Sequence, residues 1–339
     1  MFLTSEEAWH SGWRGPSVFE LHDGALRYVA PIAGWRAGAE VVHLDGTILP
    51  GFRDSHVHLG LIDADALVPG GISRVVDLGW DPTVSSTWLR ATGEPVADTP
   101  GLDIQIAGAL LTAPGGYPSR SGWAPDGASR EIANAEDGAS AVAEMLAFGA
   151  TTIKIALNSD AGPVWSDELL GAVVARAHAA GLPVVAHAQG VGEALRAARG
   201  GVDALAHTPW TERLSDDDVA EVAATCAWIS TLDIHGWGQY GRDHDFAVDN
   251  LARFAAAGGR VIYGTDLGNG SLPVGINPRE IEGLVMAGLG LDAIISALTP
   301  SADDFSGRFS FIFGARPTTS DGIAAWLGSA TSLAPSDLF

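Results

Sequence analysis

The sequence is poor in cysteine and in long apolar runs, and each shortage excludes a class of protein. Its one cysteine, Cys226, excludes an intramolecular disulfide and a cysteine metal cluster, and its apolar surroundings predict a small core residue. No stretch reaches the roughly 18 uncharged apolar residues that a membrane helix requires. The segment MFLTSEEAWH has neither a basic leader nor an apolar signal core, so we expect a cytoplasmic protein.

Basic residues are also scarce. The 339 residues include 41 Asp and Glu but only 19 Lys and Arg, which gives a formal net charge of −22. Nucleic acids and anionic membranes attract clustered Lys and Arg, so neither is an expected partner. We expect a small-molecule substrate, and a homo-oligomer is compatible with the sequence. Of the basic residues 18 are Arg, so the one lysine, Lys154, is not expected to be ordinary surface decoration.

The pattern of apolar residues divides the chain into parts. Residues 1–49 hold short strand-like runs, with Asp23-Gly24 as a hairpin turn, and predict a small β-sandwich-like domain. In residues 50–304, apolar strand runs alternate with amphipathic Ala-rich segments, which is typical of βα units around a parallel sheet. Residues 305–339 form a C-terminal segment in which FSFIFG is one candidate strand, and this segment could return to the β domain.

Eight strand-like runs can be counted in the central part of the chain. They are TILPGFRDSHVHL, ISRVVDLGW, DIQIAGALLTAP, TTIKIAL, LPVVAHAQG, ALAHTPW, AWISTLDIH and RVIYGTDLG. Helix candidates with Ser or Asp caps lie between them. An open doubly wound sheet lacks support, because no Gly-x-Gly-x-x-Gly motif follows the first strand. We therefore predict an α/β fold of the (β/α)8 TIM-barrel type.

A long connection follows the third strand run, from about Ala113 to Asn134, and is rich in Gly and Pro. Loops of this length are usually functional or mobile. The alternative is a solvated insertion that makes no contact with the substrate.

Six polar residues fall at the same end of five of these strands, where barrel enzymes build their sites. His56 and His58 are spaced by two on an extended chain, so they point to one side and can chelate one ion. The others are Lys154, His187, His207 and Asp266, on the fourth, fifth, sixth and eighth strands. Each alone has an ordinary structural explanation, such as a hydrogen-bonded histidine or a capping aspartate. Together they favour a metal site, with zinc expected and manganese, iron or cobalt as alternatives.

This ordered set of motifs resembles the amidohydrolase superfamily, and most closely its imidazolonepropionase-like and Xaa-Pro-dipeptidase-like branch. The resemblance runs from about Gly46 to Ala297 and rests on LPGFRDSHVHL, GISRVVDLG, GATTIKIAL, LPVVAHAQG, DALAHTPW and GTDLG. It implies two divalent metal ions and a carbamate, formed from CO2 on a lysine, that bridges them. The implied ligands are His56, His58 and Asp266 for the more buried ion, His187 and His207 for the other, and Lys154 as the bridge.

The implied chemistry is hydrolysis. Two metal ions roughly 3.5 to 4 Å apart can share a hydroxide and polarise a carbonyl oxygen, while Asp266 acts as the acid and base. We expect cleavage of an amide-like C–N bond in an N-acyl amino acid, a dipeptide or a cyclic amide. A lactonase or esterase is the alternative, and a non-catalytic scaffold is a third. Deamination is disfavoured, because Glu193 is a poor match to the proton-shuttling glutamate of deaminases.

Residues just past the strand ends are candidates to line the pocket. Those expected to contact the substrate are Tyr117, Asn158, Trp210 and His235, with Trp123, Trp237 and Asn269 nearby. Aromatic loop residues serve packing as often as recognition, so the sequence does not separate the substrate classes.

Overall fold

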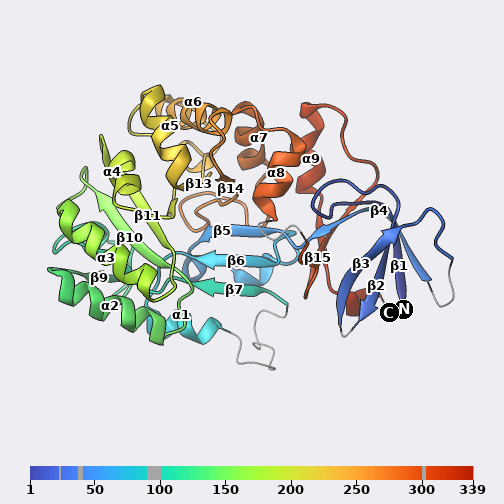
Figure 1. Cartoon of the computed structure of the whole chain (residues 1–339), viewed down its shortest axis with the longest axis horizontal. Helices are drawn as coiled ribbons and strands as arrows, with labels where there is room; N and C mark the ends of the chain where they lie inside the picture. Colours follow the sequence, from blue (N-terminus) through green and yellow to red (C-terminus); the bar gives the residue numbers. More distant parts are fainter. Residues whose placement is uncertain (23, 37–40, 90–100, 300–302, 339) are drawn as a thin grey trace.

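A computed structural model of the chain describes residues 1–22, 24–36, 41–89, 101–299 and 303–338. Figure 1 shows an α/β part that holds most of the helices and, at one end of the molecule, a sheet that lies near both termini. None of the helices in the described ranges has the length and apolar character needed to span a bilayer.

Parallel strands form the centre of the α/β part. One sheet has seven strands in the order β14-β13-β12-β11-β10-β8-β9, and a second has three in the order β5-β6-β7. The strands are β5 (Arg53–Val57), β6 (Arg74–Asp77), β7 (Asp103–Ile106), β8 (Leu110–Thr112), β9 (Ser129–Glu131), β10 (Ile153–Asn158), β11 (Val184–Gln189), β12 (Ala204–Leu205), β13 (Ala227–Ile229) and β14 (Val261–Ile262). Each of the eight strand runs predicted from the sequence contains at least one observed strand.

The two parallel sheets are connected at both sides. On one side β7 and β8 belong to the same run, which is interrupted at Gly108, a residue with a left-handed φ of 72°. On the other side a parallel bridge joins Val57 to Leu267, and the amide of Ser55 donates to the carbonyl of Tyr263 at 3.0 Å. The fold is therefore mixed α/β with parallel strands, although the described strands do not form one closed ladder of eight.

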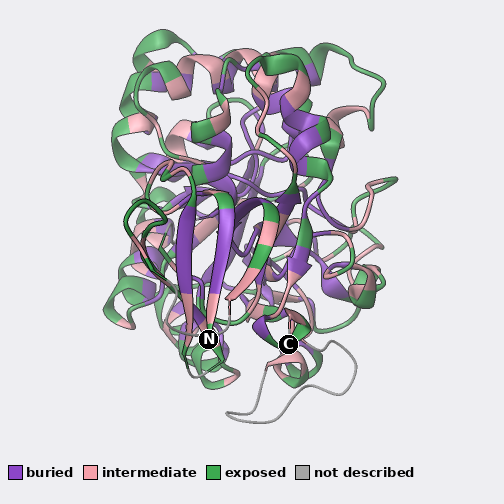
Figure 2. Ribbon diagram, turned by 90° about the vertical axis from the view of Figure 1, so that its right-hand side faces the viewer, coloured by how far each residue is buried: buried purple, intermediate pink, exposed green. Residues whose placement is uncertain are grey.

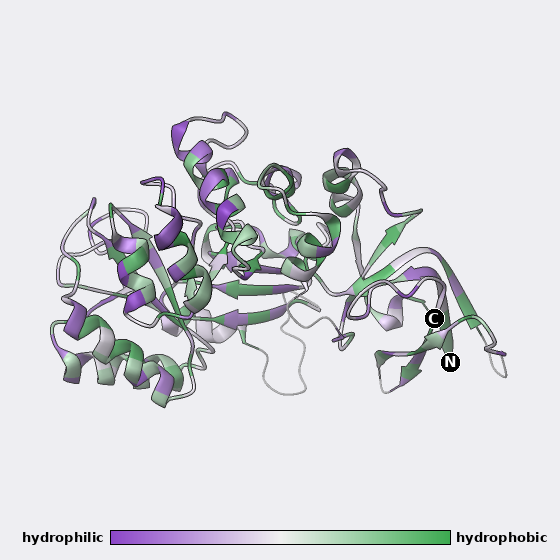
Figure 3. Cartoon of the chain, turned by 45° about the horizontal axis from the view of Figure 1, so that its top comes forward, coloured by the Kyte–Doolittle hydropathy of each residue, from purple (hydrophilic) through white to green (hydrophobic). Residues whose placement is uncertain are grey.

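Helices cover the parallel strands (Figure 1). They are α1 (Pro82–Ser85), α2 (Ala135–Ala147), α3 (Asp167–Ala179), α4 (Glu193–Arg199), α5 (Asp216–Thr225), α6 (Arg242–Ala256), α7 (Pro278–Met286), α8 (Leu291–Leu298) and α9 (Ile323–Gly328). The predicted caps are present at α3 and α5, where the hydroxyls of Ser166 and Ser215 accept backbone N–H bonds. Hydrophobic and hydrophilic residues alternate along the helices in Figure 3, as expected for helices with one face on the core.

The sheet at the end of the molecule is built from both ends of the chain. Its order is β16-β15-β4-β1-β2-β3, with the strands β1 (Phe2–Ala8), β2 (Ser17–His22), β3 (Ala25–Pro31), β4 (Val41–Pro50), β15 (Phe309–Phe313) and β16 (Thr331–Leu333). The described strands form one six-stranded sheet, in place of the predicted sandwich-like layer. The hairpin between β2 and β3 is present, although Asp23 of its predicted turn lies outside the described residues.

A small hydrophobic core holds β15 against the N-terminal strands. Phe309 is fully buried there and belongs to the same cluster as Leu3, Phe19 and Ile48, whereas Phe313 on the same strand is 72% exposed. Figure 2, which faces this end of the molecule, shows buried segments along the strands.

We expect Phe309→Ala to lower the free energy of unfolding by about 3 to 5 kcal/mol, because it leaves a cavity in this core. Phe313→Ala is the matched control and should change it by less than about 0.5 kcal/mol. Urea unfolding of the two variants beside the parent protein measures the difference. Equal effects of the two substitutions would contradict the packing of β15 described above.

Candidate metal centre

The six residues singled out in the sequence line one cavity, and all but Lys154, the second residue of β10, lie toward or just beyond the carboxyl end of a parallel strand. Lys154 pairs with Val185 in the ladder between β10 and β11, and Ala156 pairs with His187. Since alternate side chains of a strand point to the same side, Lys154 and His187 share one face of the sheet. His56 lies on β5 itself, and the other three follow the ends of their strands: His58 after β5, His207 after β12 and Asp266 after β14.

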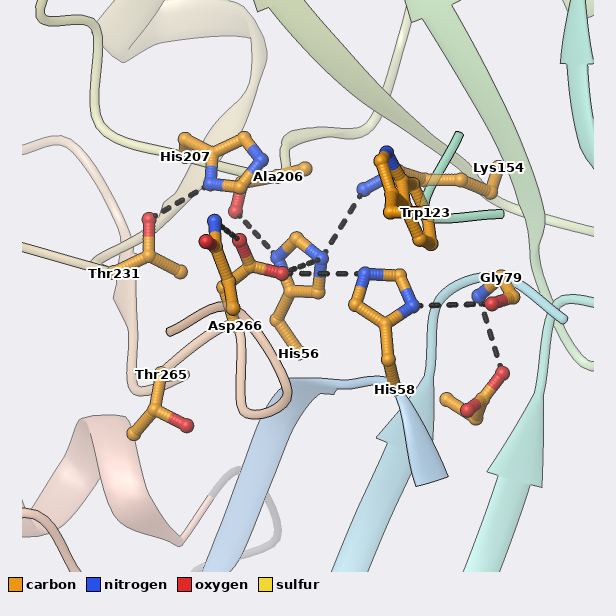
Figure 4. A network of polar contacts seen from close by, with 12 residues as sticks. His56, His58, Gly79, Trp123, Lys154, Ala206, His207, Thr231, Thr265 and Asp266 are labelled. Carbon is orange, nitrogen blue, oxygen red and sulfur yellow. Dashed lines mark hydrogen bonds and ion pairs between the residues drawn. The ribbon is translucent and has the colours of Figure 1, made fainter. Parts of the chain in front are cut away.

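Asp266 is the centre of this group (Figure 4). Its Oδ1 atom lies 3.1 Å from Nε2 of His56 and 3.2 Å from Nε2 of His58. One ligand atom each from His56, His207 and Asp266 lies within 4.8 Å of the others, and all three residues are buried. Three converging ligand atoms of this kind are the usual protein contribution to a catalytic zinc site.

The histidines are held so that one nitrogen of each ring is directed to this centre. Nδ1 of His56 lies 2.9 Å from the carbonyl oxygen of Ala206, and Nδ1 of His58 lies 3.0 Å from that of Gly79. A carbonyl can only accept, so Nδ1 carries the proton and Nε2 keeps its lone pair. Figure 4 shows both contacts.

The other two histidines are oriented by side chains. Nδ1 of His207 lies 3.0 Å from the hydroxyl of Thr231. Nε2 of His187 lies 3.2 Å from the amide nitrogen of Asn158 and 3.3 Å from Oε1 of Gln189. These contacts leave Nε2 of His207 and Nδ1 of His187 as the nitrogens available to a cation.

Burial sets the charge state of three of the histidines, whereas at His58 the effect of burial is outweighed by the contact with Asp266, which raises the pKa. Burial lowers the pKa of His187 to about 3 and holds the pKa of His56 and of His207 well below the ordinary value. Neutral imidazole is the form that binds metals. Burial alone would raise the pKa of Asp266, but the neighbouring His56 and His58 hold that pKa well below its usual range, so the carboxylate is ionised.

Lys154 carries a buried amine. The residue is 1% exposed, and its Nζ lies 3.5 Å from Nε2 of His56. Within the part of the chain that the structure describes, it forms no ion pair. Burial lowers the pKa of Lys154 to about 7, although the charge of Asp266 partly opposes this. An unpaired buried ammonium is costly, so a neutral or covalently modified amine fits this position better.

Two buried carboxylates, which the sequence analysis did not single out, hold the backbone around the centre by hydrogen bonds. Asp54 accepts bonds from the amide of His56 at 3.0 Å and from the amide and hydroxyl of Thr265 at 3.0 and 2.6 Å. It therefore ties the strand of the first two histidines to the residue before Asp266. Asp77 accepts from two backbone amides next to His58. One belongs to Leu59, at 2.7 Å, and the other to Gly79, whose carbonyl contacts the His58 ring, at 3.1 Å.

The backbone is strained at two of these positions. Asp266 has a φ of 57° and Thr231 a φ of 43°, in the left-handed region that residues with a side chain rarely adopt. Such strain costs on the order of 1 to 3 kcal/mol and is concentrated at functional sites. At Thr231 it accompanies the hydroxyl contact with His207.

A cavity of about 360 Å³ borders the centre, a volume suited to a small ligand. All six predicted ligand residues line it. Of the predicted substrate contacts, Tyr117 and Trp210 line it as well, and so do Trp123 and Asn269. Tyr117 and Trp123 come from the long loop after β8, so this loop does contribute to the pocket. Gln189, on β11, is a lining residue that the sequence analysis missed.

Asn158 and His235 were predicted as substrate contacts but do not line the cavity. The amide of Asn158 is engaged with Gln189 at 2.9 Å and with the amide of Ala161 at 3.0 Å. The ring of His235 packs on Trp210 with the centroids 4.8 Å apart. Direct contact of Asn158 or His235 with the substrate stays a prediction.

The sequence also matches a known family. Residues 47–288 match the model of the amidohydrolase family, which is more than half of the chain, so the chain belongs to this family. The resemblance predicted from the strand-end motifs is thereby confirmed.

Individual relatives are more distant. Uncharacterized protein Rv2915c of Mycobacterium tuberculosis is 30% identical over 202 residues, which are 54% of this chain and 50% of that protein. The chain thus spans about half the length of the curated relatives it matches. A Xaa-Pro dipeptidase with bound methionine superposes with a TM-score of 0.76 at 18% identity, covering 97% of this chain and 96% of that chain. A putative prolidase from Bifidobacterium longum gives 0.73 at 21% identity, with coverages of 98% and 94%. At these identities the structures share a fold.

Proposed function

We propose that this chain is a metal-dependent hydrolase that cleaves an amide-like C–N bond with two divalent cations, zinc being the expected metal. The observation that carries the proposal is the convergence of two buried, neutral histidines, His56 and His207, and the ionised Asp266 on one point beside the buried Lys154. The structural neighbours named Xaa-Pro dipeptidase and prolidase act, by those names, on peptide bonds, which supports an amide-like substrate.

The donor set suits such cations. We assign His56, His58 and Asp266 to one ion and His187 and His207 to the other, with Lys154 as a bridging carbamate. Imidazole and carboxylate ligands suit zinc and its neighbours among the divalent ions. When bound, these cations would polarise the carbonyl group of the substrate and make water a stronger acid at neutral pH.

Asp266 is the residue that we assign to proton transfer. Its ionised Oδ1 faces His56 and His58, and its Oδ2 accepts from the side-chain amide of Asn269 at 2.8 Å. Both carboxylate oxygens are therefore fixed, and the group lines the cavity in the form that can accept a proton from water. Returning that proton to the leaving nitrogen completes the cleavage.

We also propose that the parallel strands close into a (β/α)8 barrel, since Val57 and Leu267 connect the first strand to the last. In this division residues 1–49 form the small β domain, residues 50–304 the barrel, and residues 305–339 the segment that returns to the β domain. The net charge of −22 supports a small-molecule substrate and no nucleic-acid or membrane partner.

Metal content is the first test. We expect about two divalent ions per chain, and chelation should abolish turnover reversibly, because the ligands come from strands that are already folded around the site. Elemental analysis of metal-saturated, folded protein measures the ratio. A ratio of one would replace the binuclear assignment with a one-metal site, and a ratio near zero would favour a non-catalytic scaffold.

Substrate turnover is the second test of the proposed function. Metal-reconstituted protein should hydrolyse at least one class in a panel of N-acyl amino acids, other N-acyl amines, cyclic amides and dipeptides. The same panel should contain lactones and esters, since the proposed groups would also serve ester hydrolysis. Turnover of lactones alone would assign the protein as a lactonase.

A further inference from the structure

The outer walls of the cavity are aromatic and aliphatic. Tyr117 stacks on His187 with ring centroids 5.0 Å apart, and Trp123 lies 5.3 Å from the ring of His58. Trp210 meets the rings of His187 and His207 edge-on at 6.0 and 5.5 Å. Leu61, Leu110 and Ile234 complete the apolar lining. Aromatic rings placed in this way offer flat apolar surfaces to a planar group.

Outside the proposed metal ligands, the described residues that line the cavity carry no charge. Gln189 and Asn269 are neutral amides, and no arginine is present among these lining residues. Burial raises the pKa of Tyr117 to about 12, so its hydroxyl stays neutral. This hydroxyl accepts from the indole nitrogen of Trp123 at 3.2 Å, which leaves its own proton to donate.

Arg279 does not supply the missing charge, and Arg120, on the long loop after β8, does not line the cavity. Arg279 approaches from beside Ile234, but it donates from Nε to both carboxylate oxygens of Asp233 at 2.9 and 3.0 Å. Its charge is already paired with a buried carboxylate. The chain as a whole carries a formal charge of −22, which disfavours the approach of anions.

A substrate carboxylate in these walls would lose its hydration without gaining an ion pair, and this is unfavourable. A neutral aromatic group would bury apolar surface against Tyr117, Trp123 and Trp210. Resting on the proposed hydrolase function, we propose that the substrate class is amides bearing an uncharged aromatic group, without a free carboxylate beside the scissile bond. Dipeptides and N-acyl amino acids with a free carboxylate are then poor substrates.

Matched substrates test this inference. N-benzoylglycine and N-benzoylglycine methylamide release the same benzoate from the same type of bond, and they differ in the charge of the neighbouring group. We expect kcat/KM to be at least about tenfold higher for the methylamide, because only the charged partner suffers the desolvation penalty. Equal values, or a preference for N-benzoylglycine, would overturn the inference.

A binding measurement separates this inference from the proposed function. In calorimetry with metal-loaded protein, the methylamide should bind about tenfold more tightly than N-benzoylglycine, whether or not either is cleaved. Tighter methylamide binding without turnover of any amide or ester would sink the hydrolase function and leave the pocket preference standing. Turnover combined with tighter binding of N-benzoylglycine would support the hydrolase function and overturn the inference about the substrate class.

A charge-insertion variant provides the matched control. Leu61 lines the cavity and is 43% exposed, so an arginine is tolerated there. Leu61→Arg should shift the ratio of the two kcat/KM values toward N-benzoylglycine by about tenfold. Leu61→Gln, which adds a polar group without charge, should leave the ratio unchanged, as should Val191→Arg at a position that is 77% exposed and outside the cavity. Identical ratios in all these proteins would show that wall charge does not set the preference and would overturn the inference.

Discussion

Asp266→Asn is expected to lower kcat by roughly a thousandfold or more while the fold persists, because an amide neither accepts the proton nor carries the charge of the carboxylate. Asparagine is the informative replacement for a structural reason. Asp266 has a φ of 57°, and asparagine tolerates this left-handed conformation better than most residues. The substitution therefore removes the charge with little added backbone strain, which Asp266→Ala would not achieve.

Two further measurements identify the cause of the lower kcat of Asp266→Asn. Metal content distinguishes loss of a ligand from loss of a proton acceptor, since a variant that keeps its metal but not its turnover has lost the acceptor. Asp160→Asn, at an exposed position, is the control and should leave turnover unchanged. If Asp266→Asn keeps the parent's kcat, the proposed proton transfer is wrong.

Lys154→Arg should fail as completely as Lys154→Ala, with a loss of roughly a hundredfold or more in kcat/KM. A guanidinium stays protonated at any accessible pH and cannot take up CO2, so it cannot form the bridge. A lysine that served only to fill space or to carry charge would tolerate arginine with a modest loss. Steady-state kinetics of both variants, with metal content measured in parallel, compares the two cases.

The carbamate can also be tested by rescue and by mass. Bicarbonate or a short carboxylate should partly restore metal binding and activity to Lys154→Ala, because it can occupy the space that the side chain leaves. Intact mass of the parent protein under mild conditions should show the addition of one CO2. An unmodified Lys154 in metal-loaded protein, together with an active Lys154→Arg variant, would move the protein toward a one-metal mechanism.

The sequence predicted the fold well where the pattern was periodic. The alternation of apolar strands and capped helices gave all eight strand runs, and Ser166 and Ser215 marked the starts of α3 and α5 correctly. The candidate strand FSFIFG corresponds to β15 of the six-stranded sheet, but its pairing with β4 could not be predicted, because the two segments are distant in sequence. The break of the ladder at Gly108 was not predicted either, although an isolated glycine in a strand run can mark such an interruption.

The site, like the fold, could be predicted only in part. The six proposed ligands were found because histidine, lysine and aspartate at strand ends are unusual in an apolar pattern. Asp54 and Asp77 were missed, although each is a carboxylate inside an apolar run, because their role depends on amides of neighbouring loops. The sequence could not show that Asn158 contacts Gln189 and that His235 packs on Trp210, because these contacts depend on side-chain directions at and after strand ends.

The position of β4 has a consequence for synthesis of the chain. This strand lies between β1 and β15, and its Pro50 pairs with Phe309. The N-terminal strands therefore cannot complete their sheet until the last part of the chain has left the ribosome. Contacts so distant in sequence form slowly, because the entropy of closing a long loop must first be overcome. Since β4 leads through two residues into β5, the strand that carries His56 is supported at its amino-terminal side by pairing between segments that are far apart in the sequence.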